Sequence, residues 1–486
     1  MNTRYAHTIS GRMAQYAASL RYEALPNDIR KLARLVLLDG IGCALVGSIT
    51  PEIAQIRAAV VSAGGGGSTD AVLWGSHQKA PLALAVLANS AALHAREIDD
   101  FGGCAHSGAV VIPTALGMAA RVNAGGRDLL TSIVIGYDIA RRAMDGGGGY
   151  VAFKERGWHS TSTCGGFGAA AAAGSLLGLD AERMQWAIGY AGCNAGGTWA
   201  FIPEGAMSKR VHPGFAAQTG VMSAFLAANG VTAPATIFEA EWGGYYSSYM
   251  PGAVPMEDAV KDLGVDFRIR LVGFKPYAAC QGIHSSLDVV LGMRREQGVR
   301  ADDVARVTVR GSRTHVKQLA KQHVQTLLDA QMSLPYSIAS ALISGGAMLD
   351  QYTKEALLRP DVNDLASRVT VVHESSVANG EEPYVDVELT DGRLLSGRMR
   401  VARGDYTNPL SEIEVREKFR AVSGLVFSSD RVARIEEVVS NIEEMKDAGE
   451  LISLLLPENA DNASTLELPH ERQTHSHPSV EDDFAK

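Results

Sequence analysis

Paired cysteines are missing from this sequence. No two of its five cysteines lie closer than about thirty residues, so the chain contains no CxxC motif. This spacing excludes iron–sulfur clusters and zinc sites that are built on cysteine pairs. Well-separated cysteines are typical of reduced thiols, and we therefore expect a cytoplasmic protein.

Basic residues are fewer than acidic ones. Lysine and arginine number 45 against 54 aspartate and glutamate residues, which gives a net charge of -9 at pH 7. Because no basic stripe runs along the chain, the sequence argues against a nucleic-acid-binding surface. No apolar run reaches the ~18 residues of a membrane-spanning helix. We therefore expect neither nucleic acid nor a membrane as a partner, although a few cations in one pocket suffice to bind a small anion.

Aromatic residues are scarce at 6%, whereas alanine is plentiful and glycine contributes 51 residues. Small side chains let helix backbones approach each other, so we expect many helices packed at short distance. The length of 486 residues is enough for two or three domains.

The hydrophobic pattern divides the chain into a helical part and a mixed part. Apolar residues recur at helical spacing up to about residue 271 and again near the C-terminus. Between these parts, VARVTVRG and YVDVELTDGRLLSGRM alternate as strands do, and TDG is a hairpin turn signal. We predict a mainly α protein, with a large all-helical domain from residues 1–272 and 401–456 and an inserted smaller α+β lid domain over 273–400. The polar residues 457–486 are predicted to be a disordered tail.

The stretch GWHSTSTCGGFGAAAAAG places His159 directly before a run of small residues. It contains a GxGxxA pattern, but GWHSTST is not the apolar strand that precedes a dinucleotide-binding loop. The small residues instead predict a buried helix. His159 and Ser160 lie at its start, where backbone N–H groups attract an anion.

Three further segments place ionisable residues just before a helix. GAMSKRVHPG and GFKPYAACQGIHSSLD combine lysine with histidine, and EIDDFGGCAHSGAVV combines acids with histidine. Taken singly, each segment is typical of a charged helix cap. Together they predict one site that binds a polycarboxylate and removes a proton next to a carboxylate.

These segments, in their order along the chain, resemble the MmgE/PrpD family of 2-methylcitrate dehydratase and cis-aconitate decarboxylase. The resemblance also rests on LDGIGCALVGS, ANSAALHAREIDD, GYDIARRA and SLPYSIASAL, and it covers most of the chain. It implies a helical domain with an inserted lid, a homodimer, no metal or organic cofactor, and a small di- or tricarboxylate substrate.

When the family's functional residues are matched position by position to this sequence, the resemblance also implies which residues form the site. The catalytic ones would be His106, His159, Lys209, Lys275 and Tyr336. The family's acidic element falls on residues 97–100, where Glu97 replaces an aspartate. The residues expected to bind substrate are Glu97, Asp99, Asp100, Ser160, Arg210, His212, Tyr277 and His284.

The sequence leaves the reaction open. The leading interpretation is a cofactor-independent hydro-lyase that dehydrates a 2-methylcitrate-like acid. An epimerase or isomerase, or a decarboxylase, acting on an iminodisuccinate- or cis-aconitate-like acid would share its carbanion intermediate. For an epimerase, Cys104 is the candidate second acid or base. The remaining alternative is a carboxylate-binding protein without catalysis.

Overall fold

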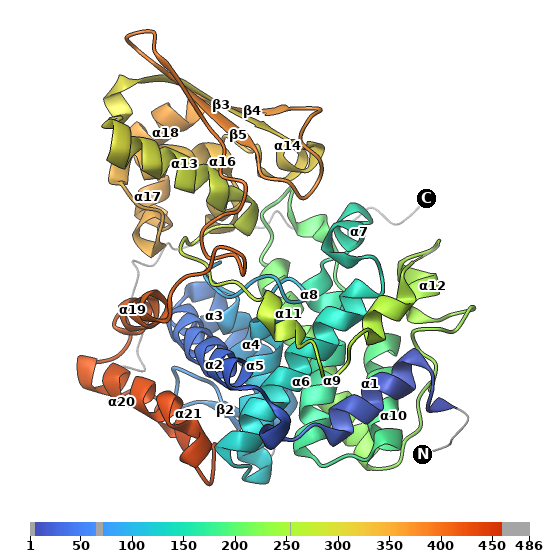
Figure 1. Ribbon diagram of the computed structural model, residues 1–486. Helices are drawn as coiled ribbons and strands as arrows, with labels where there is room; N and C mark the ends of the chain where they lie inside the picture. The colour runs from blue at the N-terminus through green and yellow to red at the C-terminus, as the bar shows by residue number, and fades with distance from the viewer. Residues whose placement is uncertain (1–4, 65–70, 253, 459–486) are drawn as a thin grey trace, which may run out of the picture.

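The computed structural model describes residues 5–64, 71–252 and 254–458. Figure 1 shows two bodies, a larger one of packed helices and a smaller one that contains a sheet. Both ends of the described chain belong to the larger body, and the segment from α13 to β6 forms the smaller one, the lid. The prediction of a mainly α fold with a small sheet domain is confirmed. The predicted tail lies outside the described residues from position 459 onward.

The small-residue stretch forms α9 (Gly165–Leu176), which is buried from Gly165 to Gly174. A Cβ atom on Gly168 would lie 2.3 Å from the carbonyl oxygen of Gly136, so the two helix backbones meet where neither has a side chain. The predicted close packing is confirmed. The main neighbours of α9 are α5 (Ser107–Val122), α6 (Gly126–Asp145), α10 (Ala181–Cys193) and α11 (Ser208–Ala228).

The two ends of the chain meet in the helical body. Helix α2 (Asn27–Ser48) packs against α19 (Glu412–Ser423), and the two share a buried ion pair between Asp39 and Lys418 at 2.8 Å. The body also contains α1 (Ile9–Ser19), α3 (Pro51–Ala63), α4 (Leu82–Leu93), α7 (Gly149–Glu155), α8 (Ser160–Thr163), α12 (Tyr245–Tyr249), α20 (Ser429–Ser440) and α21 (Glu450–Ser453), with β1 (Ala71–Val72) paired to β2 (Lys79–Ala80).

A four-stranded sheet with the order β4–β3–β5–β6 forms one layer of the lid. The strands are β3 (Val304–Gly311), β4 (Val369–His373), β5 (Tyr384–Leu389) and β6 (Leu394–Gly397). Only the β3–β4 pair is parallel among these described strands. The predicted TDG turn joins β5 to β6 and places Gly392 at a φ of 85°. The lid helices are α13 (Gln281–Gln297), α14 (Arg313–Leu319), α15 (Leu327–Gln331), α16 (Leu334–Ser344), α17 (Lys354–Leu357) and α18 (Pro360–Ser367).

The chain enters and leaves the lid through two segments that lie side by side. The backbone N–H of Phe274 donates to the carbonyl oxygen of Gly404 at 2.9 Å. Gly404 has a φ of 91°, and a Cβ atom there would lie 2.1 Å from the carbonyl oxygen of Phe274, so only glycine fits. Gly273 also forms a backbone bridge with Phe101. The acidic segment before Phe101 therefore lies where the two bodies join.

Across the described ranges, no single helix has both the length and the apolar composition to span a membrane. Helices α2 and α3 meet these criteria only as a pair, and they are bent by 89° at the break between them.

Candidate active site

A cleft of about 450 Å³ opens between the helical body and the lid. The helical body contributes Glu97, His106, His159 and Lys209 to its lining, and the lid side contributes residues such as Cys280. All four segments singled out in the sequence therefore meet at one cleft. The segment that contains Cys280 also contributes Lys275, which binds Glu97.

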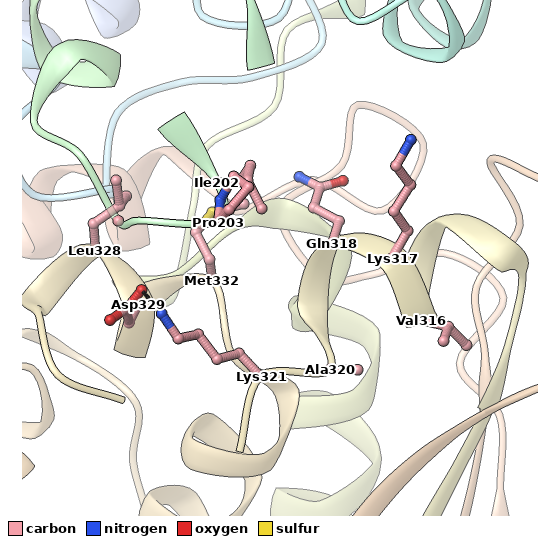
Figure 2. Close-up of a pocket in the computed structure, with 11 residues that line it drawn as sticks. Ile202, Pro203, Val316, Lys317, Gln318, Ala320, Lys321, Leu328, Asp329 and Met332 are labelled. Carbon is pink, nitrogen blue, oxygen red and sulfur yellow. Dashed lines mark hydrogen bonds and ion pairs between the residues drawn. The ribbon is translucent and has the colours of Figure 1, made fainter. Parts of the chain in front are cut away.

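A smaller cleft of about 280 Å³ lies beside α14 and α15 (Figure 2). Lys321 is ion-paired there with Asp329 at 2.6 Å, so its charge is already balanced. The described residues that line this cleft include no histidine. The larger cleft, whose lining includes three histidines beside cations, is therefore the candidate active site.

Glu97 lies at the centre of a cluster of buried cations. Its carboxylate is ion-paired with Lys209, with Arg210 at 3.2 Å and with Lys275 at 3.2 Å. Burial alone would raise the pKa of Glu97, but Lys209 and Lys275 hold this pKa well below its usual range. The backbone of Glu97 has a φ of 55°, a conformation that costs energy for a residue with a side chain and that recurs at functional sites. Three cations thus converge on a single carboxylate.

Asp99 connects two imidazoles. Its Oδ2 atom lies 2.8 Å from Nδ1 of His94 and 3.1 Å from Nδ1 of His106. Burial would raise the pKa of Asp99, but His106 and His94 keep this pKa well below its usual value. Asp99 is therefore an ionised acceptor that fixes both rings.

These contacts determine which nitrogen of each ring carries the proton. The Lys209 ammonium has only donors and lies 3.0 Å from Nε2 of His94, so that Nε2 accepts and Nδ1 donates to Asp99. Nδ1 of His106 faces two acceptors, Asp99 and the backbone carbonyl oxygen of Asp100 at 2.9 Å. His106 therefore carries its proton on Nδ1 and keeps the lone pair of Nε2 free for proton transfer.

His159 lies in an aromatic part of the cleft. Its Nδ1 is 3.0 Å from Nδ1 of His212, and its ring centroid lies 5.1 Å from that of Trp199 and 5.9 Å from that of Phe201. Burial, reinforced by the charge of Lys209, lowers the pKa of His159 well below its usual value. The ring centroids of His159 and His106 are 6.4 Å apart, so one small molecule can reach both imidazoles.

His94, Asp99 and His106 are also the described residues that have the spacing of metal ligands, with their ligand atoms all within 4.8 Å of one another. A divalent cation would have to replace the two imidazole contacts of Asp99 and would lie next to the Lys209 ammonium. The donor set therefore fits a hydrogen-bonded network better than a metal centre.

Several predicted residues have local partners in or near the lid instead of lining the cleft. The hydroxyl of Tyr336 donates to the carbonyl oxygen of Gln351 at 2.7 Å, and burial raises its pKa to about 12. Tyr277 donates to Asp288 at 2.7 Å. Nε2 of His284 lies 3.0 Å from the backbone carbonyl oxygen of Ala279, and burial lowers the pKa of His284 to about 3. The described lining of the cleft includes none of these three predicted residues.

Asp100, Cys104 and Ser160 are buried behind the cleft surface. The carboxyl group of Asp100 accepts from the backbone N–H of Gly108 at 3.1 Å, and burial raises its pKa well above the usual value. The Cys104 thiol accepts from the hydroxyl of Ser107 at 3.4 Å, and burial raises its pKa to about 12. Oγ of Ser160 has no hydrogen-bond partner among the described residues. This geometry offers no support for Cys104 as a second acid or base.

Sequence reasoning gave no role to His94 or Gln331, although both belong to the cluster. The side-chain oxygen of Gln331 accepts from Arg210 at 2.6 Å, and its NH₂ group donates to the carbonyl oxygen of Arg96 at 2.8 Å. His94 stands five residues before Asp99, and a search for imidazoles near the acidic segment would have found it. No pattern in the sequence marks Gln331, which reaches the cluster from the lid.

Two family models match the chain, the MmgE/PrpD N-terminal domain over residues 11–256 and the MmgE/PrpD C-terminal domain over residues 277–444. The chain belongs to the MmgE/PrpD family. The resemblance found in the sequence is thereby confirmed, and the two matched regions correspond broadly to the helical body and the lid.

Relatives of the chain within the MmgE/PrpD family are named as decarboxylases. The chain is 30% identical to the cis-aconitate decarboxylase-like protein oryM of Aspergillus oryzae, over 92% of its own length and 97% of that protein. It is 27% identical to a cis-aconitate decarboxylase of Aspergillus terreus, with coverage of 92% and 96%. Identity to the cis-aconitate decarboxylase of Homo sapiens is 25%, with coverage of 91% and 94%.

Proposed function

We propose that this protein is a lyase that acts on a small polycarboxylate through a carbanion next to a carboxylate. The observation that carries the proposal is the position of two imidazoles, His106 and His159, on the cleft that Lys209 also lines. Cations stabilise the negative charge that develops on such a carbanion, and imidazoles transfer the proton.

The charges of the cluster favour a carboxylate ligand. Lys209, Arg210 and Lys275 carry three positive charges, and the ionised Glu97 and Asp99 carry two negative ones. One positive charge remains without a counter-charge in a buried site, where electrostatic interactions are stronger than in water. A substrate carboxylate supplies the missing charge.

We favour decarboxylation of a cis-aconitate-like acid, because the relatives that match over the whole chain are named as cis-aconitate decarboxylases. In this reaction the bond between carbon and one carboxylate breaks and CO₂ leaves. The electron pair passes into a conjugated carboxylate, where Lys209 and Lys275 stabilise it. A histidine then delivers a proton to carbon, and His159 is our candidate because a bound polyanion offsets the effect of Lys209 on its pKa.

Dehydration of a 2-methylcitrate-like acid is the second candidate. It needs a base for the proton α to a carboxylate and an acid for the departing hydroxyl group. The free Nε2 of His106 suits the base, since Nδ1 is directed at Asp99. An epimerase has less support, because the thiol of Cys104 is buried against Ser107.

One experiment separates these reactions. Purified enzyme is incubated with a panel of di- and tricarboxylates in deuterated water and followed by NMR. Decarboxylation gives a product that has lost one carboxylate and gained deuterium, whereas dehydration gives an alkene and epimerisation gives exchange with inversion. Binding without any of these changes would support the non-catalytic alternative and contradict our proposal.

The homodimer implied by the family resemblance stays a prediction. Phe215 and Met222, seven residues apart on α11, are 56% and 46% exposed and thus offer apolar surface for a partner subunit. Sedimentation equilibrium of the purified protein measures the oligomeric state directly. The cytoplasmic location also stays a prediction.

A further inference from the structure

Lys154 of α7 is a partly buried cation that faces the cleft without an acidic partner. It lines the cleft, and no described carboxylate lies within ion-pair distance of its ammonium. Its close neighbours are aromatic, with Nζ 5.5 Å from the ring centroid of Tyr150 and 5.8 Å from that of Trp199. Lys209 and Lys275, by contrast, are already bound to Glu97.

A chain of contacts connects Lys154 to the catalytic cluster. The Trp199 ring that lies near Lys154 is also in edge contact with His159, at 5.1 Å between centroids. The Trp199 indole is fixed because its N–H donates to the carbonyl oxygen of Trp158 at 3.0 Å. His159 in turn lies 6.1 Å from the ring of His94, which contacts Lys209. His159 thus lies between the ring of Trp199, which is near Lys154, and the ring of His94, which contacts Lys209.

The Lys154 ammonium also faces the lid. His315 in α14 and Cys280 at the start of α13 line the same cleft as Lys154. Burial, reinforced by the charge of Lys154, lowers the pKa of His315 to about 4. Burial lowers the pKa of Lys154 itself, while Cys280 partly offsets this effect. The ammonium therefore lies near residues of the lid as well as residues of the helical body.

We propose that Lys154 binds the substrate carboxylate farthest from the reacting carbon and thereby makes the site selective for tricarboxylates over dicarboxylates. This inference rests on the proposed function, because it takes the reacting end of the substrate to lie at His159 and Lys209. A buried ammonium held only by aromatic rings lacks the counter-charge that ion pairs provide elsewhere in the cleft. A third carboxylate supplies it, and a dicarboxylate does not.

The test compares two ligands that differ by one carboxylate. Propane-1,2,3-tricarboxylate and glutarate are titrated by calorimetry into the unmodified protein and into Lys154→Met, Lys154→Arg and Lys317→Met. Lys317 is the matched control, since it is an exposed lysine of the lid that lines the smaller cleft instead (Figure 2). Methionine keeps the length and apolar stem of lysine, so the change removes mainly the charge.

We expect Lys154→Met to weaken binding of the tricarboxylate by about 10- to 100-fold and binding of glutarate by less than about 3-fold, which corresponds to losing roughly one charge contact. Lys154→Arg should restore most of the affinity, and Lys317→Met should leave both ligands unaffected. An equal loss for both ligands, or no loss for either, overturns the inference.

Failure of the proposed function gives a different result. In that case the unmodified protein turns over no member of the polycarboxylate panel. If the unmodified protein is active but its preference for the tricarboxylate is unchanged in Lys154→Met, only the role of Lys154 is wrong. If the unmodified protein binds neither ligand, both proposals fail.

Discussion

Nζ of Lys209 lies 3.0 Å from Nε2 of His94, and this contact sets the proton positions of the whole His–Asp network. A cationic donor at Nε2 leaves His94 neutral, and burial together with Lys209 lowers the pKa of His94 to about 3. Its remaining proton points at Asp99, which also accepts a hydrogen bond from His106. In the proposed reaction Asp99 is therefore expected to be a positioning residue that acts through His106.

Replacing Asp99 by asparagine should lower kcat by roughly 100-fold or more while the protein stays folded. Asparagine keeps the shape, but its amide group can present a donor where His106 needs an acceptor, so the tautomer of His106 is no longer fixed. Steady-state kinetics and circular dichroism measure the two effects. The acidic limb of the pH profile of kcat/KM should also shift in Asp99→Asn relative to the unmodified protein. A merely structural defect would not shift it.

Asp100→Asn is the matched control for Asp99→Asn. Burial raises the pKa of Asp100 well above its usual value, which favours the neutral form, and its carboxyl group accepts from the backbone N–H of Gly108 instead of from a histidine. We expect activity within a few-fold of normal. A loss as large as that of Asp99→Asn would show that both acids act together and would contradict the assignment.

Lys275→Ala should lose most activity and keep its fold. Lys275 is fully buried and ion-paired with Glu97 at 3.2 Å, beside the expected position of a substrate carboxylate. Loss of such a charge contact costs on the order of 2–5 kcal/mol. At ~1.4 kcal/mol per factor of ten this is roughly 30-fold or more in kcat/KM. A folded variant with near-normal turnover would remove Lys275 from the site.

Binding of a polycarboxylate should be accompanied by proton uptake. The pKa of His159 is lowered first by burial and then by Lys209, and a bound polyanion opposes the second effect, so this pKa rises on binding. At a pH between the free and the bound pKa of His159, the imidazole takes up a proton on binding. Calorimetry in buffers with different ionisation enthalpies measures the number of protons. The uptake should fall in His159→Gln, and equal uptake in both proteins would contradict this role.

Cys104→Ser should keep turnover within a few-fold. Burial raises the pKa of the Cys104 thiol to about 12, and the thiol faces Ser107, outside the described lining of the cleft. Turnover of the best panel substrate provides the measurement. A collapse of turnover, with the α-proton of the substrate still exchanging into deuterated water, would instead indicate an epimerase with two acid–base groups.

Local sequence patterns predict the mainly α fold with its small sheet domain, and they single out segments that line the cleft. The alanine–glycine run of α9 and the TDG turn have local causes, namely close backbone approach and a positive φ. Lysines and histidines next to helix starts also stood out. Tyr336 was placed by resemblance alone, and its hydroxyl has a local partner in Gln351.

Other contacts of the cluster join residues far apart in the chain, and no local sequence pattern predicts them. Gln331 reaches Arg210 across 121 positions of the chain, and Lys154 meets Trp199 only because the intervening segments fold back. The left-handed backbone of Glu97 likewise depends on the cations that surround its carboxylate. Such contacts arise from the tertiary fold, which periodicity and motif spacing do not describe.

The close contact of Gly168 with Gly136 has a consequence for how this protein can change over evolution. Helix α9, which begins at Gly165 shortly after His159, is packed backbone to backbone, so a single added methyl group there would force a shift inside the helical body. That part of the helical body cannot be remodelled in small steps. The lid side of the cleft is supplied by loops and short helices, which tolerate insertion and exchange far better. New substrate preferences should therefore arise on the lid side, with the proton-transfer chemistry left in place.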